Sequence, residues 1–147
     1  MENDAAAQLA AITDARAAVA DRLVTPWWYH PVLGLAAAGY VVGYSFGGTV
    51  VRLVTVVLFV GVAFALVSAY KRKTGVWVSG LNAGRASRWA IAMGVVLGVV
   101  AVAGLVVGMY TDLRWPVWCL AGVTFVATVL LGRRFDAALR AQLRAGA

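Results

Sequence analysis

Only a few side chains in this 147-residue chain are of the types that carry out acid–base, nucleophilic or metal chemistry. His30 is the single histidine and Cys119 the single cysteine. The acidic side chains number six, at Glu2, Asp4, Asp14, Asp21, Asp112 and Asp136. One histidine and one thiol cannot supply the ligands of a multi-histidine or thiolate metal site, and Cys119 has no neighbouring base that would activate it. We therefore expect no catalytic residues, no metal site and no cofactor.

The composition places these side chains in a membrane protein. Hydrophobic residues make up 63% of the chain and charged residues only 13%. A small soluble domain needs more polar side chains than this to cover its surface. The net charge of +7 arises from basic residues that flank apolar runs. Because that pattern is typical of membrane topology, we expect no nucleic-acid partner.

Four apolar runs are long enough to cross about 30 Å of hydrocarbon at about 1.5 Å per residue. They cover residues 31–46, 50–70, 89–110 and 115–132, within a predicted transmembrane domain of residues 26–134. Short links join the first run to the second and the third to the fourth, so we predict an all-α integral membrane four-helix bundle of two antiparallel hairpins. Both hairpins contain the pattern Ala-Gly-x-Val-Val-Gly. Either one hairpin is a duplicate of the other, or the similarity is chance in a sequence rich in Gly, Ala and Val.

None of the six acids lies inside a predicted span. Proton coupling within a membrane requires a titratable side chain at depth, because its burial couples protonation to conformation. The sequence therefore argues against a proton-driven antiporter.

The distribution of basic residues predicts the orientation. Of the 13 Lys and Arg residues, only Arg52 and Arg114 lie in the two short links when these are counted as residues 47–52, which include the start of the second run, and 111–114. The positive-inside rule then places both termini and the middle link in the cytoplasm, and we predict a multi-pass protein of the cell (inner) membrane. Lys71, Arg72 and Lys73 are expected to contact anionic phospholipid of the lipid bilayer on the cytoplasmic side.

Both ends of the chain have amphipathic patterns. Residues 1–25 are predicted to form an N-terminal helix, with apolar residues such as Leu9 and Ile12 recurring at spacings of three and four. This helix is too rich in alanine to be stable alone, so we expect it to lie on the membrane surface, on the cytoplasmic face of the bundle or on a partner helix. Residues 135–147 are predicted to continue the fourth helix as a basic amphipathic tail.

The most distinctive string in the sequence lies between Pro26 and Pro31. Its four rings are those of Trp27, Trp28, Tyr29 and His30. Rings with an apolar face and a polar edge prefer the membrane interface. We interpret the string as an interfacial belt, serving either as a membrane anchor or as a platform for a lipid headgroup or a partner.

Small residues recur at four-residue spacing in two of the predicted spans. The rows are Gly39 and Gly43, Gly94 and Gly98, and Gly104 and Gly108. Such rows let helix backbones approach closely in lipid, so we predict that they pack helices within the chain or between chains.

Residues 16–34 combine a leading Ala/Arg-rich helix with Asp21-Arg22-Leu23 and the string from Pro26 to Pro31. This arrangement resembles uncharacterised small four-helix multi-pass membrane proteins of actinobacteria. The resemblance implies the same topology, and that family brings no assigned activity.

The sequence contains features that suit protein contacts, namely an amphipathic N-terminal helix and rows of glycine, and no set of side chains suited to catalysis. These features favour a subunit that works by contact. We expect an accessory, scaffold or regulatory subunit, not an enzyme, that forms a homo-oligomer or binds another membrane protein. The alternative is an oligomeric small channel or facilitator, whose polar seam would come from Tyr40, Tyr44, Thr55, Ser68, Thr124 and Thr128. A lipid-modifying membrane enzyme is the remaining alternative.

Overall fold

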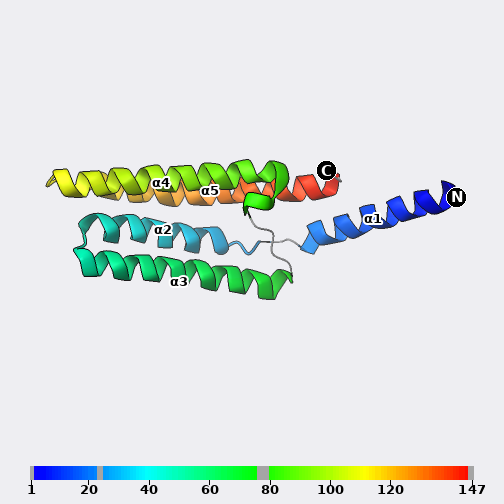
Figure 1. The fold of residues 1–147 in the computed structure, drawn as a ribbon, viewed down its shortest axis with the longest axis horizontal. Helices are drawn as coiled ribbons and strands as arrows, with labels where there is room; N and C mark the ends of the chain where they lie inside the picture. Colours follow the sequence, from blue (N-terminus) through cyan, green and yellow to red (C-terminus); the bar gives the residue numbers. More distant parts are fainter. Residues whose placement is uncertain (1, 23–24, 76–79, 146–147) are drawn as a thin grey trace.

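The computed structural model describes residues 2–22, 25–75 and 80–145. Five α-helices and two short 3₁₀ turns follow one another along the chain (Figure 1). They are α1 (Glu2–Arg22), α2 (Tyr29–Phe46), α3 (Thr49–Thr74), η1 (Gly80–Asn82), η2 (Gly84–Ala86), α4 (Ser87–Tyr110) and α5 (Trp115–Ala145). The described residues contain no strand, so the prediction of an all-helical chain is confirmed.

Three of the helices are long and apolar enough to cross a membrane. They are α3, α4 extended by η2, and α5. These helices carry large exposed apolar side chains, such as Phe64 on α3 and Val99 on α4, as expected of surfaces that face lipid. The 18 residues of α2 fall short of that apolar content because they include His30, Pro31 and three tyrosines.

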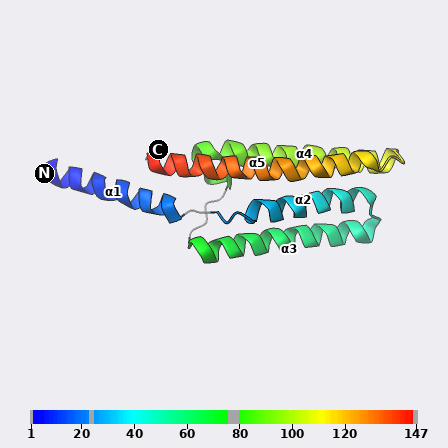
Figure 2. The same ribbon diagram turned by 180° about the vertical axis from the view of Figure 1, so that it is seen from behind.

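α2, which is not among these three helices, is the most central one. In both views α2, α3, α4 and α5 lie lengthwise beside one another (Figures 1 and 2). α2 packs against α3, α4 and α5, whereas α3 packs mainly against α2. One face of α2 is buried, through His30, Gly34, Ala37, Val41 and Ser45. Because neighbouring helices cover this face, its polar side chains do not have to meet lipid.

The glycine rows differ in what surrounds them. A Cβ on Gly108 would collide with the backbone carbonyl of Ser45, and a Cβ on Gly43 would collide with the hydroxyl of Thr55. These two glycines therefore allow close contacts of α2 with α4 and with α3. Gly104 likewise faces the Ser45 hydroxyl across the α2–α4 contact. In contrast, a Cβ on any of three other glycines would meet nothing within 4 Å, at Gly39, Gly94 and Gly98.

α1 projects beyond the end of the other helices at which α5 finishes (Figures 1 and 2). It contacts α5 near its own C-terminal end, where Ala20 is buried. There Arg144 Nη2 lies 3.1 Å from Asp21 Oδ1, which joins the acidic N-terminal segment to the basic tail. This exposed ion pair contributes about 0–1 kcal/mol.

The last helix is unbroken through the predicted membrane boundary. α5 runs for 31 residues, past Arg133 and Arg134, with Leu139 buried on the same side as Phe135 and Leu143. α3 also continues beyond its predicted end at residue 70, through Lys71 to Thr74. It stops at Gly75, whose left-handed φ of 71° lets its N–H bond to the carbonyl of Lys71.

Candidate functional site

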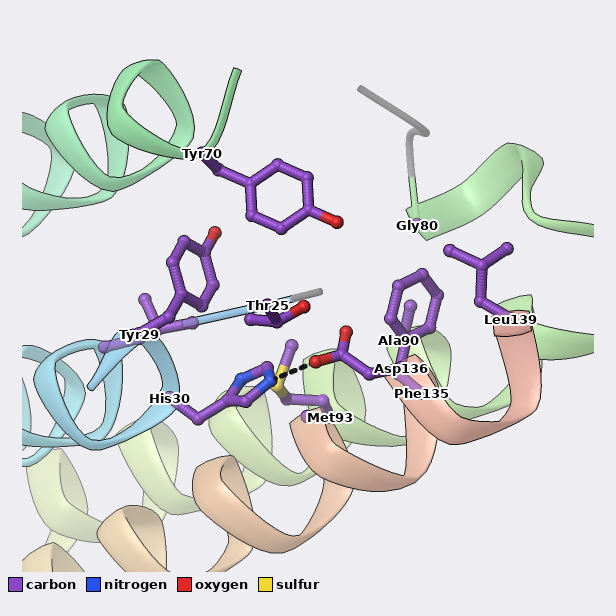
Figure 3. A pocket seen from close by; sticks show the side chains of 12 residues that line it. Thr25, Tyr29, His30, Tyr70, Gly80, Ala90, Met93, Phe135, Asp136 and Leu139 are labelled. Atoms are coloured by element: carbon purple, nitrogen blue, oxygen red, sulfur yellow. Dashed lines mark hydrogen bonds and ion pairs between the residues drawn. The ribbon is translucent and has the colours of Figure 1, made fainter. Parts of the chain in front are cut away.

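A cavity of about 220 Å³ lies where α2 begins, α3 ends and the final third of α5 passes (Figure 3). Residues from α2, α3, η1, α4 and α5 and from the segment before α2 line it. They are Thr25, Tyr29, His30, Leu33, Tyr70, Gly80, Ala90, Met93, Gly132, Phe135, Asp136 and Leu139. The wall is mostly apolar, and its polar groups converge from separate elements, as in small-molecule sites.

A histidine–aspartate pair forms the polar part of the wall. His30 Nε2 lies 2.7 Å from Asp136 Oδ2, between residues 106 positions apart in the chain. Their side chains are only 9% and 15% exposed. With Asp136 ionised, Nε2–H donates to the carboxylate and the bond is charge-assisted. The pair ties the start of α2 to α5.

The local sequence explains how His30 reaches this position. The N–H of Tyr29 bonds to the carbonyl of Pro26 at 3.0 Å, which makes a turn immediately before α2. Pro31 then fits the first helical turn, where a missing N–H costs nothing. His30 therefore occupies the first turn of α2, on the face that packs against α5.

Gly132 makes room for the imidazole. It lies one helical turn before Asp136, on the same face of α5. A Cβ at Gly132 would collide with the His30 ring, closest to Nδ1. Nδ1 has no hydrogen-bond partner within the described residues, which leaves Nε2 as the nitrogen that binds α5.

Aromatic side chains form the opposite side of the cavity. The rings of Tyr29 and Tyr70 are 5.7 Å apart between centroids and inclined at 62°, and Tyr29 meets His30 edge-on at 5.3 Å. Phe135, beside Asp136 on α5, adds a third ring to the same space (Figure 3). Edge-to-face pairs of this kind are worth about 0.5–1.5 kcal/mol beyond the area that they bury.

The free oxygen of Asp136 is directed into the space between these rings (Figure 3). No Lys or Arg is among the described residues that line the cavity. Arg140, one turn further along α5, donates its Nε to the backbone carbonyl of Asp136 at 3.4 Å, not to the carboxylate. The chemistry on offer is therefore one carboxylate oxygen, aromatic faces and an apolar floor.

The predicted interfacial belt divides in the structure. The Trp27 side chain is 82% exposed, and Trp28 is half-buried. Tyr29 and His30 instead turn inward and line the cavity. An interfacial ring is expected to present its polar edge to water. His30 does not, because its Nε2 bonds to Asp136 inside the protein.

The structure places the other predicted residues outside the cavity. Lys71, Arg72 and Lys73 form the exposed last turn of α3, where positive charge complements the helix dipole. None of the predicted glycines lines the cavity, and the glycine that shapes it, Gly132, was not singled out from the sequence. Asp136 was assigned only to the tail. The sequence does contain one signal for Asp136. This residue follows Gly132 by four positions, and the lone histidine lies at the same predicted interface.

No protein-family model, no curated protein and no solved structure matches the chain. The resemblance to small actinobacterial membrane proteins, and the source that it implies, therefore stays a prediction.

Proposed function

We propose that this protein is a multi-pass membrane subunit that acts by contact, as an accessory, scaffold or regulatory component, with α1 as its partner-binding arm. The observation that carries the proposal is the unpacked apolar face of α1. Leu9 is 66% and Ile12 49% exposed on a helix that, among the described residues, packs mainly against α5, near one end. An alanine-rich helix of 21 residues has little stability in water without a packing surface, so a partner helix or membrane surface stabilises it.

The proposal includes four spans, with α2 crossing beside α3, α4 and α5 as an antiparallel four-helix bundle, and both termini in the cytoplasm. It is supported by the position of the basic residues. The basic last turn of α3 and the C-terminal third of α5 occupy the same end of the molecule as the start of α2 (Figures 1 and 2). Arg52 and Arg114 lie near the opposite end. The positive-inside rule assigns the first end to the cytoplasm of a cell membrane.

Association with a second membrane-embedded chain is part of the same proposal. Gly39, Gly94 and Gly98 leave open backbone surface on α2 and α4 that no described side chain occupies. In lipid such surface favours close contact with another helix, either of a second copy or of a different protein. Lys71, Arg72 and Lys73 are exposed and available to anionic headgroups.

The channel alternative receives less support because its polar seam is divided. Tyr40 and Thr55 line a groove of about 260 Å³ between α2 and α3. Thr124 and Thr128 are fully buried, and the Thr124 hydroxyl bonds to the carbonyl of Leu120. Side chains consumed by packing within one chain cannot line a shared pore.

Enzymatic chemistry receives less support as well. The buried histidine engages Asp136 through Nε2, and its Nδ1 is buried against Gly132. A general base needs a free nitrogen within reach of the substrate proton.

Native mass spectrometry of complexes gently extracted from membranes tests the contact function. We expect a second polypeptide at fixed stoichiometry, lost in Leu9→Glu and Ile12→Glu variants because an acid on the apolar face of α1 opposes its burial. Ala7→Glu adds the same charge to the opposite, exposed face and serves as the control. A homo-oligomer alone, with all three variants unchanged, would contradict the role of α1.

Thiol labelling tests the crossing of α2. In a Cys119→Ser chain, Thr49→Cys should react with an impermeant maleimide in intact cells, whereas Asp14→Cys should react only after permeabilisation. Both positions are exposed, so reactivity reports the side of the membrane. Reaction of both cysteines from the same side would show that α2 does not cross.

A further inference from the structure

We propose that the cavity between the start of α2 and the end of α3 binds a small organic cation, an ammonium group with short apolar substituents. The inference goes beyond the contact function and does not depend on it. The cavity is smaller than the roughly 300–1,000 Å³ of drug-sized ligand sites, so its ligand is small. Its volume of about 220 Å³ is enclosed by residues of five elements, α2, α3, η1, α4 and α5. The cavity is therefore more than a gap between two packed helices.

The charge of the lining selects a cation. Among the described residues that line the cavity, Asp136 is the only acid and none is Lys or Arg. Arg140, outside this lining, binds the backbone carbonyl of Asp136 and not its carboxylate. His30 occupies Oδ2 and holds the carboxylate in one orientation, which leaves the other oxygen facing the cavity (Figure 3). A buried carboxylate with one free oxygen attracts a positively charged donor and repels a phosphate or a carboxylate.

The rings select an ammonium group over a metal ion. Tyr29, Tyr70 and Phe135 surround the space that the free Asp136 oxygen faces (Figure 3). The faces of aromatic rings attract alkylammonium groups, and cages of such rings recognise quaternary ammonium ligands. A hard metal ion would instead require several oxygen ligands, and the described lining residues offer only one carboxylate.

The ammonium group has two possible sources, a free amine of the cytoplasm or an amine-bearing phospholipid headgroup. The predicted position of the cavity at the membrane interface is compatible with both. Both place the same group beside Asp136, so the proposal concerns this shared chemistry, and the experiment separates the sources.

Binding of choline to the full-length protein in detergent, compared with its uncharged isostere 3,3-dimethylbutan-1-ol, tests the first source by calorimetry or ligand-observed NMR. We expect choline to bind more tightly than the isostere. Asp136→Asn should weaken choline binding about ten- to a hundredfold, because the neutral amide no longer attracts the ammonium charge, and leave the isostere unaffected. Asp112→Asn, at an exposed acid of the opposite link, should change neither.

Phe135→Leu keeps the apolar bulk and the carboxylate and should weaken choline binding about two- to tenfold through loss of a ring face. It keeps the proposal testable if Asp136→Asn does not fold. For the second source, native mass spectrometry after exchange into mixed nanodiscs should show retained phosphatidylethanolamine over phosphatidylglycerol, and loss of that preference in Phe135→Leu.

Binding of choline in detergent identifies a free-amine site, and selective lipid retention alone identifies a headgroup site. The proposal would be overturned if the protein showed no lipid preference and, in addition, either bound choline and its isostere equally or bound choline unchanged in Asp136→Asn.

Discussion

Gly132→Ala is the substitution for which the structure predicts the sharpest effect. The new Cβ would occupy space held by the His30 imidazole, and the ring cannot stay in place beside it. Overpacking of this kind costs about 1–3 kcal/mol, and displacement of the ring also breaks its bond to Asp136, worth about 1.5–3 kcal/mol. The higher helix propensity of alanine returns about 1 kcal/mol. We expect a net destabilisation of about 1.5–5 kcal/mol.

Thermal unfolding in detergent, followed by tryptophan fluorescence, measures this loss. Gly122→Ala is the matched control because it lies on the same helix and its Cβ would meet nothing within 4 Å. It should leave the melting temperature unchanged or raise it. In a His30→Ala background the clash is absent, so Gly132→Ala should cost little and the double-mutant cycle should show strong coupling. An equal cost of Gly132→Ala with and without the imidazole would refute the reasoning.

Two further substitutions test contacts between other elements. Gly108→Ala should destabilise the protein by about 1–3 kcal/mol, because the new Cβ would meet the backbone carbonyl of Ser45, which cannot rotate away as a side chain can. Gly98→Ala on the same helix is the control. Equal melting temperatures of the two variants would contradict the close α2–α4 contact. Asp21→Asn should lower stability by less than about 1 kcal/mol, because its pair with Arg144 is solvent-exposed, and a larger loss in the melting temperature would mean that the pair does more than orient α1.

The His30–Asp136 pair accounts for the unusual composition of α2. A helix that begins with tyrosine, histidine and proline is poorly suited to face lipid, and α2 instead packs against three other helices. Two of its polar side chains bond within the protein: His30 through Nε2 to Asp136, and Ser45 to the carbonyl of Val41 at 2.7 Å. The position of α2 among its neighbours thus removes the need for an all-apolar surface.

The sequence by itself determined the all-helical class and the approximate extent of the long apolar helices. Apolar runs of about 20 residues satisfy their backbone hydrogen bonds in lipid only as helices, so length and hydropathy suffice to identify them. The continuation of α5 past Arg133 also followed from the spacing of Phe135, Leu139 and Leu143. The start of α2 at Tyr29, before Pro31, was not recovered, because helix boundaries depend on local turns that hydropathy does not register.

The tertiary structure alone decided the cavity and the pair that orders it. His30 and Asp136 are 106 residues apart and lie in segments that the sequence assigned to different roles, a membrane belt and a cytoplasmic tail. Which face of α5 meets the start of α2 depends on the packing of all the helices together. The tertiary structure also decided which glycines allow close helix contacts. Their spacing marks Gly94, Gly98 and Gly108 alike, but of these three only Gly108 meets the backbone of another helix. Periodicity gives the faces of a helix, but packing determines what each face touches.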